Sequence, residues 1–143
     1  MILFCDTSAL VKLYVQEDFT DAVRAAAEAA QIVAACRIAW AEAMAALARR
    51  VRECPADAGT IDRVRERLRE DWPDFAIVEV TQSLVELAGD YAETFALRGY
   101  DSVQLAAAST LRRAAGGEVH FACFDARLQK AAQVLGLQPC VEN

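Results

Sequence analysis

The sequence predicts an α/β fold in which a parallel sheet of four to five strands carries helices on both faces. Short apolar runs alternate with longer stretches of helical periodicity along the chain, a pattern typical of parallel strands joined by helical crossovers. Hydrophobic residues make up 55% and charged residues 25% of the 143 residues, which excludes intrinsic disorder. We expect one domain, residues 1–143, with a core of its own.

In the N-terminal half, the first apolar run ends at Asp6 and indicates a strand buried on both faces. Helical spacing of apolar residues, or a high alanine content, indicates the helices that follow. Pro55 and Gly59 break the helical pattern, and Trp72-Pro73 ends the last helix. In order, the expected elements are a strand at Met1–Cys5, helices at Ser8–Val15 and Phe19–Ala30, a strand at Gln31–Cys36, and helices from Ile38 to about Arg52 and at Thr60–Asp71.

In the C-terminal half, Arg98-Gly99 separates two helices and Gly116-Gly117 forms a turn. The apolar runs on either side of these breaks have the length of buried strands. In order, the expected elements are a strand at Phe75–Val80, helices at Thr81–Leu97 and Tyr100–Ala115, a strand at Val119–Phe124, a helix at Ala126–Leu135 and a short strand at Leu137–Val141.

The charge balance and the cysteines limit the classes of function. A formal net charge of −6 gives no general attraction to nucleic acid or to an anionic membrane, so nucleic-acid contacts would need a local basic patch. The five cysteines are far apart and lack a C-x-x-C pair, which favours reduced thiols over disulfides or zinc. The single histidine, His120, also argues against a zinc site. Since neither a signal peptide nor a membrane span is found, we expect a cytoplasmic protein.

Three acidic residues stand where ligands bind in parallel sheets. Asp6 ends the first expected strand, Asp125 ends the fourth, and Asp101 opens a helix whose body is uncharged. Each of them could serve as the N-cap of a helix, whose free N–H groups an aspartate oxygen accepts. However, the carboxyl ends of parallel strands meet at one edge of the sheet, where ligands bind. A shared site is therefore the competing interpretation.

Glu42 is the only charged residue between Ile38 and Ala48. Because the flanking residues are apolar all round the helix, the sequence predicts that this helix is largely buried. A buried carboxylate requires a partner, either an arginine or a metal ion. If several acids converge, a divalent cation such as Mg²⁺ or Mn²⁺ would relieve their repulsion.

Four segments give the chain a family resemblance. The first is the opening strand with Asp6-Thr7-Ser8-Ala9-Leu10, and the second is WAEAMAALAR around Glu42. The third runs from Leu97 to Ala108 around Asp101, and the fourth from Phe124 to Ala132 around Asp125, with Leu135-Gly136-Leu137 following. In order and spacing they resemble the motifs of PIN-domain ribonucleases, specifically VapC-like toxins of type II toxin–antitoxin pairs, and the match spans residues 2–141.

This resemblance implies an endoribonuclease that depends on Mg²⁺ or Mn²⁺ and cuts RNA with a metal-activated water. It implies that Asp6, Glu42, Asp101 and Asp125 bind the metal and that Ser8 supports them. It also implies a homodimer, a VapB-like antitoxin whose tail covers the active-site groove, and a larger assembly with that antitoxin. This chain departs from the family at two positions, because many members have His in place of Gln104 and Thr or Ser in place of Cys123.

Basic residues that could meet RNA stand at two places in the sequence. Arg49 and Arg50 are at the end of the Glu42 helix, and Arg112 and Arg113 are at the end of the Asp101 helix. They rank first as phosphate contacts because few acids stand next to them, although solvated salt bridges are the alternative.

Other functions remain open at this stage. A catalytically silent PIN-like module that binds RNA or protein is the main alternative. A phosphatase of the haloacid-dehalogenase type with Asp6 as nucleophile is disfavoured, because Ser8 occupies the position where that family needs a second aspartate. A receiver domain is excluded on similar grounds, since the first strand does not end in an acidic pair.

Overall fold

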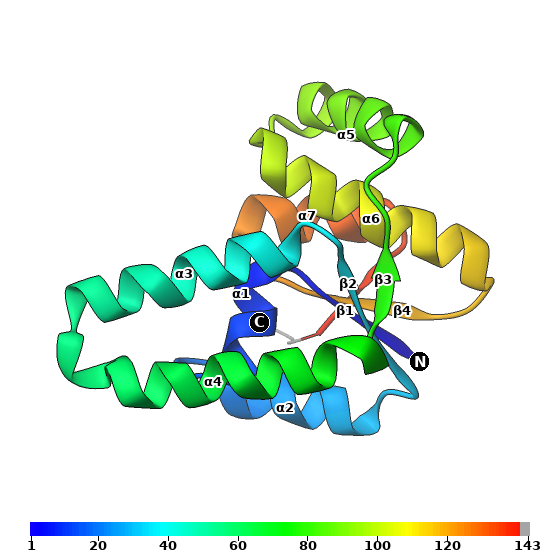
Figure 1. The fold of residues 1–143 in the computed structure, drawn as a ribbon. Helices are drawn as coiled ribbons and strands as arrows, with labels where there is room; N and C mark the ends of the chain where they lie inside the picture. Colours follow the sequence, from blue (N-terminus) through cyan, green and yellow to red (C-terminus); the bar gives the residue numbers. More distant parts are fainter. Residues whose placement is uncertain (141–143) are drawn as a thin grey trace.

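A computed structural model describes residues 1–140 (Figure 1). Its single sheet has the strand order β3-β2-β1-β4-β5, and each neighbouring pair is parallel. This confirms the predicted parallel sheet, with five strands. The strands are β1 (Ile2–Cys5), β2 (Ile32–Cys36), β3 (Ala76–Val78), β4 (Val119–Ala122) and β5 (Gln138–Pro139). Val141, the last residue of the strand predicted at Leu137–Val141, lies outside the described residues.

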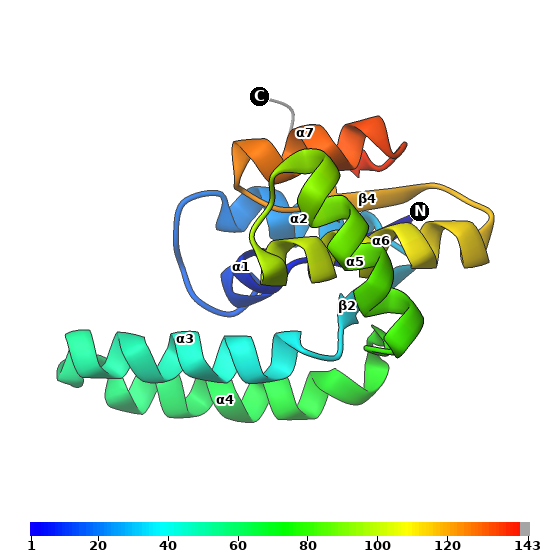
Figure 2. The same ribbon diagram turned by 90° about the horizontal axis from the view of Figure 1, so that it is seen from above.

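Seven α-helices cover the two faces of this sheet in the described chain. The α3–α4 pair forms a long hairpin that extends beyond the sheet, as Figures 1 and 2 show. The helices are α1 (Thr7–Lys12), α2 (Thr20–Ala29), α3 (Ala39–Glu53), α4 (Ala58–Asp71), α5 (Gln82–Phe95), α6 (Gly99–Ala115) and α7 (Ala126–Val134), and the short 3₁₀ turns η1 (Pro55–Asp57) and η2 (Trp72–Asp74) flank α4.

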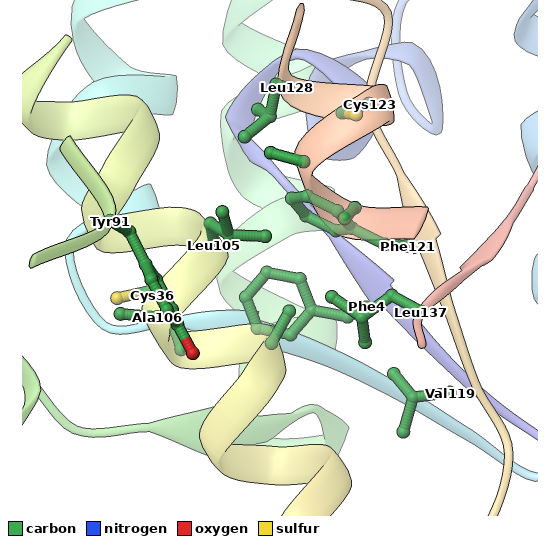
Figure 3. Close-up of a cluster of buried hydrophobic side chains, with 14 of the residues drawn as sticks. Phe4, Cys36, Tyr91, Leu105, Ala106, Val119, Phe121, Cys123, Leu128 and Leu137 are labelled. Atoms are coloured by element: carbon green, nitrogen blue, oxygen red, sulfur yellow. The ribbon is translucent and has the colours of Figure 1, made fainter. Parts of the chain in front are cut away.

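Side chains of the central strands alternate between two hydrophobic clusters. Phe4 and Phe121 point into the cluster beneath α5, α6 and α7, where their ring centroids lie 5.5 Å apart (Figure 3). Leu3 and Cys5 point the other way, into the cluster formed with α1, α3 and α4. Because β1 is buried on both faces, its sequence is apolar at every position, as the sequence analysis predicted.

The element boundaries differ from the predicted ones mainly at the ends. Helix α1 stops at Lys12 instead of Val15, and α4 begins at Ala58, so that Gly59 lies inside the helix. After α7, Gly136 adopts a φ of +81°, and a Cβ there would come within 2.9 Å of the Arg112 guanidinium. The sharp turn into β5 therefore depends on glycine at this position.

One expectation about α3 is wrong. The helix is not largely buried, since it buries only the face carrying Ala39, Ala43 and Leu47 and exposes Ala41 and Ala45. Alanine is a strong helix former and exposes little apolar surface, so a run of apolar letters here does not require burial on all sides. Glu42 is accordingly half-buried at the border between the two faces.

In the part of the chain that the structure describes, every helix is too short or too polar to span a bilayer.

Candidate active site

A pocket of about 950 Å³ lies at the carboxyl edge of the sheet. All four acids singled out in the sequence line it: Asp6, Glu42, Asp101 and Asp125. Each stands at or near the start of a different helix, namely α1, α3, α6 and α7. The partial positive charge of these helix N-termini favours acidic groups there.

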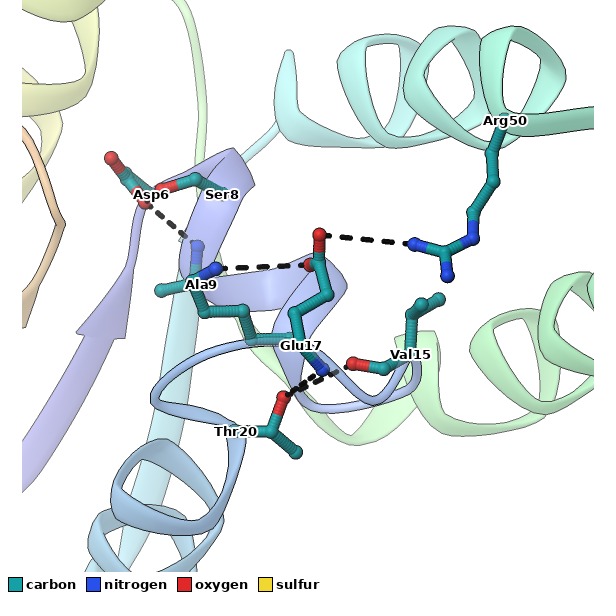
Figure 4. Close-up of polar contacts among 8 residues, drawn as sticks. Asp6, Ser8, Ala9, Val15, Glu17, Thr20 and Arg50 are labelled. Carbon is teal, nitrogen blue, oxygen red and sulfur yellow. Dashed lines mark hydrogen bonds and ion pairs between the residues drawn. The ribbon is translucent and has the colours of Figure 1, made fainter. Parts of the chain in front are cut away.

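Asp6 is the most buried of the four acids, with 8% of its surface exposed. Its Oδ1 accepts hydrogen bonds from the Ala9 backbone N–H at 2.9 Å and the Ser8 hydroxyl at 2.7 Å (Figure 4). Burial, with a smaller contribution from the negative charges of Asp101 and Glu42, outweighs these hydrogen bonds and raises the pKa of Asp6 from 3.8 to about 6. Asp6 is thus both the N-cap of α1 and a carboxylate held among other negative charges.

Glu42 is held by a small hydrogen-bond network. Its Oε1 accepts from the Thr7 hydroxyl at 2.9 Å and from the Gln104 Nε2 at 3.0 Å. Gln104 Nε2 also lies 3.2 Å from the Thr7 hydroxyl. The arginine partner considered as an alternative for Glu42 is therefore not found among the described residues, where two neutral donors take its place.

Asp101 and Asp125 lie closer to solvent. The Arg98 Nε donates to Asp101 Oδ2 at 3.1 Å across one turn at the start of α6. Asp125 Oδ1 accepts from the Leu128 backbone N–H at 2.9 Å and caps α7. Helix capping, the competing interpretation of the acids, thus applies to Asp6 and Asp125 without keeping either of them out of the pocket.

The oxygen atoms around the pocket are chemically suited to a hard divalent cation. Asp6, Glu42 and Asp125 each accept the hydrogen bonds described above through one carboxylate oxygen, which leaves the second oxygen open to a cation. The buried Oε1 of Gln104 also lacks a partner there. Carboxylate and amide oxygens are ligands that Mg²⁺ and Mn²⁺ accept.

As they stand, the side chains do not form a finished metal site. Within the described part of the chain, no three Asp, Glu, His or Cys side chains form a group that could hold an ion. In the metal-free protein Cys123 is a neutral thiol, because burial and the neighbouring acids, among them Asp6 and Asp125, raise its pKa. The acids line one pocket, but three of them could hold one ion together only if their side chains moved closer.

The structure separates the two pairs of candidate RNA-binding arginines. Arg49 lines the pocket and pairs with Glu53, whereas Arg50 reaches across to Glu17 at 3.9 Å (Figure 4). Arg112 and Arg113 stand in the last turn of α6. At 1.5 Å per residue, eleven residues of helix put Arg112 roughly 16 Å from Asp101 along the helix axis.

Several residues that line the pocket were not predicted from the sequence. Thr7 was quoted only as part of a motif, and Lys12, Tyr100 and Phe124 were not considered as site residues. The available signal was their position, since Tyr100 and Phe124 each stand directly before one of the four acids. Thr7 and Gln104 meet Glu42 across 35 and 62 residues of sequence, which no local pattern reveals.

Comparisons with known proteins agree with this fold and these motifs. The sequence profile of the PIN domain matches residues 3–134. Ribonuclease VapC45 of Mycobacterium tuberculosis (strain CDC 1551 / Oshkosh) is 33% identical over 114 residues, which cover 75% of this chain and 74% of the relative. Ribonuclease VapC49 of M. tuberculosis (strain ATCC 25618 / H37Rv) shows the same identity and coverage.

Solved structures show the same fold at lower sequence identity. A toxin–antitoxin complex from Klebsiella pneumoniae superposes with a TM-score of 0.69 at 21% identity, covering 100% of both chains. FitAcB from Neisseria gonorrhoeae gives a TM-score of 0.62 at 17% identity, covering 97% of this chain and 96% of the other. The parallel fold thus has counterparts among solved structures. This chain belongs to the PIN domain family and is a distant homologue of the VapC ribonucleases.

Proposed function

We propose that this chain is a divalent-metal-dependent endoribonuclease that acts as the toxin of a toxin–antitoxin pair. The observation that carries the proposal is the convergence of Asp6, Glu42, Asp101 and Asp125 on one pocket. The relation to the VapC ribonucleases gives this acidic pocket its most direct interpretation, hydrolysis of RNA phosphodiesters.

Asp6, Glu42, Asp101 and Asp125 would hold Mg²⁺ or Mn²⁺, which when bound supplies a water activated for attack on the phosphodiester. Ser8 and the Ala9 N–H fix one oxygen of Asp6, and thereby orient the other. Thr7 and Gln104 fix Glu42 in the same way. Arg98 holds Asp101 at the rim and would release it, at least in part, when the acids draw together.

The partner proposed for this site is a VapB-like antitoxin. A solved structure with this fold is a toxin–antitoxin complex, which supports the assignment. A pocket lined by four carboxylates would attract a basic side chain, and such a side chain would compete with a cation for the same oxygens. We further propose that the chain forms a homodimer and a larger assembly with the antitoxin.

The test is thermal unfolding of the antitoxin-free protein against increasing Mn²⁺, together with cleavage of RNA in the same buffer. A ligand of the folded state at about 100 times its Kd adds about 2.7 kcal/mol of stability. We expect a saturating rise in Tm and RNA cleavage for the wild type, and neither for Asp101→Asn. Because the Arg98 side chain is largely exposed to solvent, loss of its ion pair with the half-buried Asp101 should change the metal-free stability little.

The matched control is Asp90→Asn, which removes a charge of the same kind at an exposed position on α5 outside the pocket. It should keep both the Mn²⁺ response and the cleavage. If Mn²⁺ raises the Tm of wild type and Asp101→Asn equally and both cleave RNA, Asp101 does not hold the metal and the proposed metal site is wrong. A wild type with no response to millimolar Mn²⁺ and no cleavage would instead identify a silent binding module.

A further inference from the structure

Two exposed aromatic rings are associated with the acidic pocket. Among the large hydrophobic residues of the described chain, those with a third or more of their surface exposed include only two aromatic residues, Phe19 at 53% and Tyr100 at 51%. Tyr100 lines the pocket directly. Phe19 stacks on Phe124, which also lines the pocket, with ring centroids 5.2 Å apart and ring planes 21° from parallel. Aromatic rings left exposed at a site are candidates for binding a ligand.

Each of these aromatic groups is paired with a cation and an acid. The Arg98 guanidinium lies 5.0 Å from the centroid of Tyr100, and Asp101 is the next residue. The Lys12 ammonium lies 5.0 Å from the centroid of Phe124, and Asp125 is the next residue. In both groups a cation lies over an aromatic ring, and an acidic residue directly follows that aromatic residue in the sequence.

Phe19 also has an unfavourable backbone conformation. Its φ is +67°, in the left-handed region that a bulky side chain rarely adopts. It stands at the N-cap position of α2 without a side-chain hydrogen bond to the helix, where Ser, Thr, Asp or Asn would cap better. Backbone strain of this kind often marks functional sites. Helix capping therefore does not explain a phenylalanine at this position.

We propose that Tyr100 and the Phe19–Phe124 pair are positioning residues that hold bases of the RNA by stacking, next to the phosphate that the metal-activated water would attack. The proposal rests on the ribonuclease function proposed above and adds the residues that would hold the bases of its substrate. Aromatic rings accept any base by stacking, and neighbouring cations follow the backbone, which is how single strands are bound. In a duplex the bases are stacked on one another and not available to these rings.

Protein binding to the same rings is the competing use. A protein interface of useful size needs a continuous apolar centre, with charged residues depleted there. Tyr100 and Phe124 instead line the pocket together with four acids, and each lies against a cation. This mixture of aromatic and charged residues favours a negatively charged strand with flat bases over an apolar protein surface.

The experiment measures binding of a fluorescent oligouridine and of a blunt-ended, perfectly paired RNA duplex to the full chain in EDTA, and then cleavage of the same oligouridine with Mn²⁺. Tyr100→Leu keeps apolar volume but removes the ring, and Tyr100→Phe restores the ring. We expect Tyr100→Leu to weaken binding of the oligouridine about tenfold, within the range for loss of one stacked base. Duplex binding should stay unchanged, and Tyr100→Phe should bind the oligouridine like the wild type.

The control for loss of exposed apolar surface is Val134→Ala, at a position on α7 that is 74% exposed and outside the pocket. Its RNA binding should equal that of the wild type. The unfolding midpoint of each variant, measured in the same buffer, identifies any variant that is not folded. Phe19→Leu tests the second ring independently and should weaken oligouridine binding in the same direction.

The possible outcomes separate this proposal from the proposed function. If the wild type cleaves RNA and both Tyr100→Leu and Phe19→Leu bind oligouridine normally, the stacking proposal is overturned while the ribonuclease stands. If Tyr100→Leu changes the mass of the protein in solution and leaves RNA binding intact, the ring belongs to a protein interface and the proposal is likewise overturned. If the wild type neither binds nor cleaves RNA, both proposals fall.

Discussion

At the scale of single residues, the acids of the pocket differ in how deeply they are buried. Asp6 is buried, whereas Asp125 is exposed, although both cap a helix through one carboxylate oxygen. For Asp6, burial outweighs the hydrogen bonds from Ala9 and Ser8, so that its pKa rises. The charge of Asp6 therefore reduces the stability of the metal-free protein while suiting the residue to bind a cation.

This gives a pH-dependent prediction for Asp6→Asn. Because the folded-state pKa of about 6 lies above the ordinary value of 3.8, the folded state holds the proton more tightly than the unfolded state. The cost of the ionised carboxylate therefore appears as pH rises from about 4 to about 6. Asp6→Asn should stabilise the metal-free protein by about 2–3 kcal/mol at pH 7.5 and hardly at all at pH 3.5. Urea unfolding at both pH values checks this.

Asp125→Asn is the matched control for this prediction. It also changes an aspartate cap to asparagine, which caps equally well, but at an exposed position. Its stability should therefore differ from that of the wild type by less than about 0.5 kcal/mol. A similar gain in both variants would mean that general charge, rather than the burial of Asp6, destabilises the protein.

Gln104 gives a second prediction at this scale. Its Nε2 donates to Glu42, and groups that orient a metal ligand typically contribute 10–100-fold to metal affinity. Gln104→Leu should therefore weaken Mn²⁺ binding at least about tenfold, measured by the Mn²⁺ concentration at half of the maximal Tm shift. Gln104→His retains a ring N–H donor and should keep most of the affinity. Equal Mn²⁺ affinity in the leucine variant would show that Thr7 alone orients Glu42.

At the scale of elements, the sequence predicted the order and type of strands and helices and placed the acids at their ends. Apolar runs such as Met1–Cys5 define buried strands without reference to the rest of the chain. The exposure of α3 was not predictable in this way, because alanine is compatible with core and surface alike. Which of its faces is buried depends on α1 and α4, with which it packs.

Helix α3 therefore offers a prediction about packing. Ala43 is 1% exposed and Ala45 is exposed, two residues further along the same helix. Ala43→Met should cost about 1–3 kcal/mol by overpacking the core, whereas Ala45→Met should change stability by less than about 0.5 kcal/mol. Denaturant unfolding of the two variants checks this. Equal effects would mean that the two faces of α3 are packed differently from the arrangement described above.

At the scale of the whole molecule, the topology brings distant acids together. Strands β1, β2 and β4 lie side by side and run in the same direction, so the segments that follow them all begin at one edge of the sheet. This is why Asp6 and Asp125, which directly follow strands, could be predicted to share a site, whereas the family resemblance added Glu42 and Asp101. The contacts of Thr7, Gln104 and Arg98 with the acids could not be predicted, since they depend on side-chain positions that only the packed helices define.

The distribution of charge over the molecule gives the last prediction. With a net charge of −6, RNA binding depends on a few local cations. Arg52 lines the pocket and has no ion-pair partner among the described residues, whereas Arg113 stands at the far end of α6. Arg52→Gln should weaken RNA binding and lower the slope of log Kd against log salt by about 1, while Arg113→Gln should leave both unchanged. If the Arg113 variant shows the larger change, the RNA reaches the last turn of α6, and Arg113 is a phosphate contact as the sequence suggested.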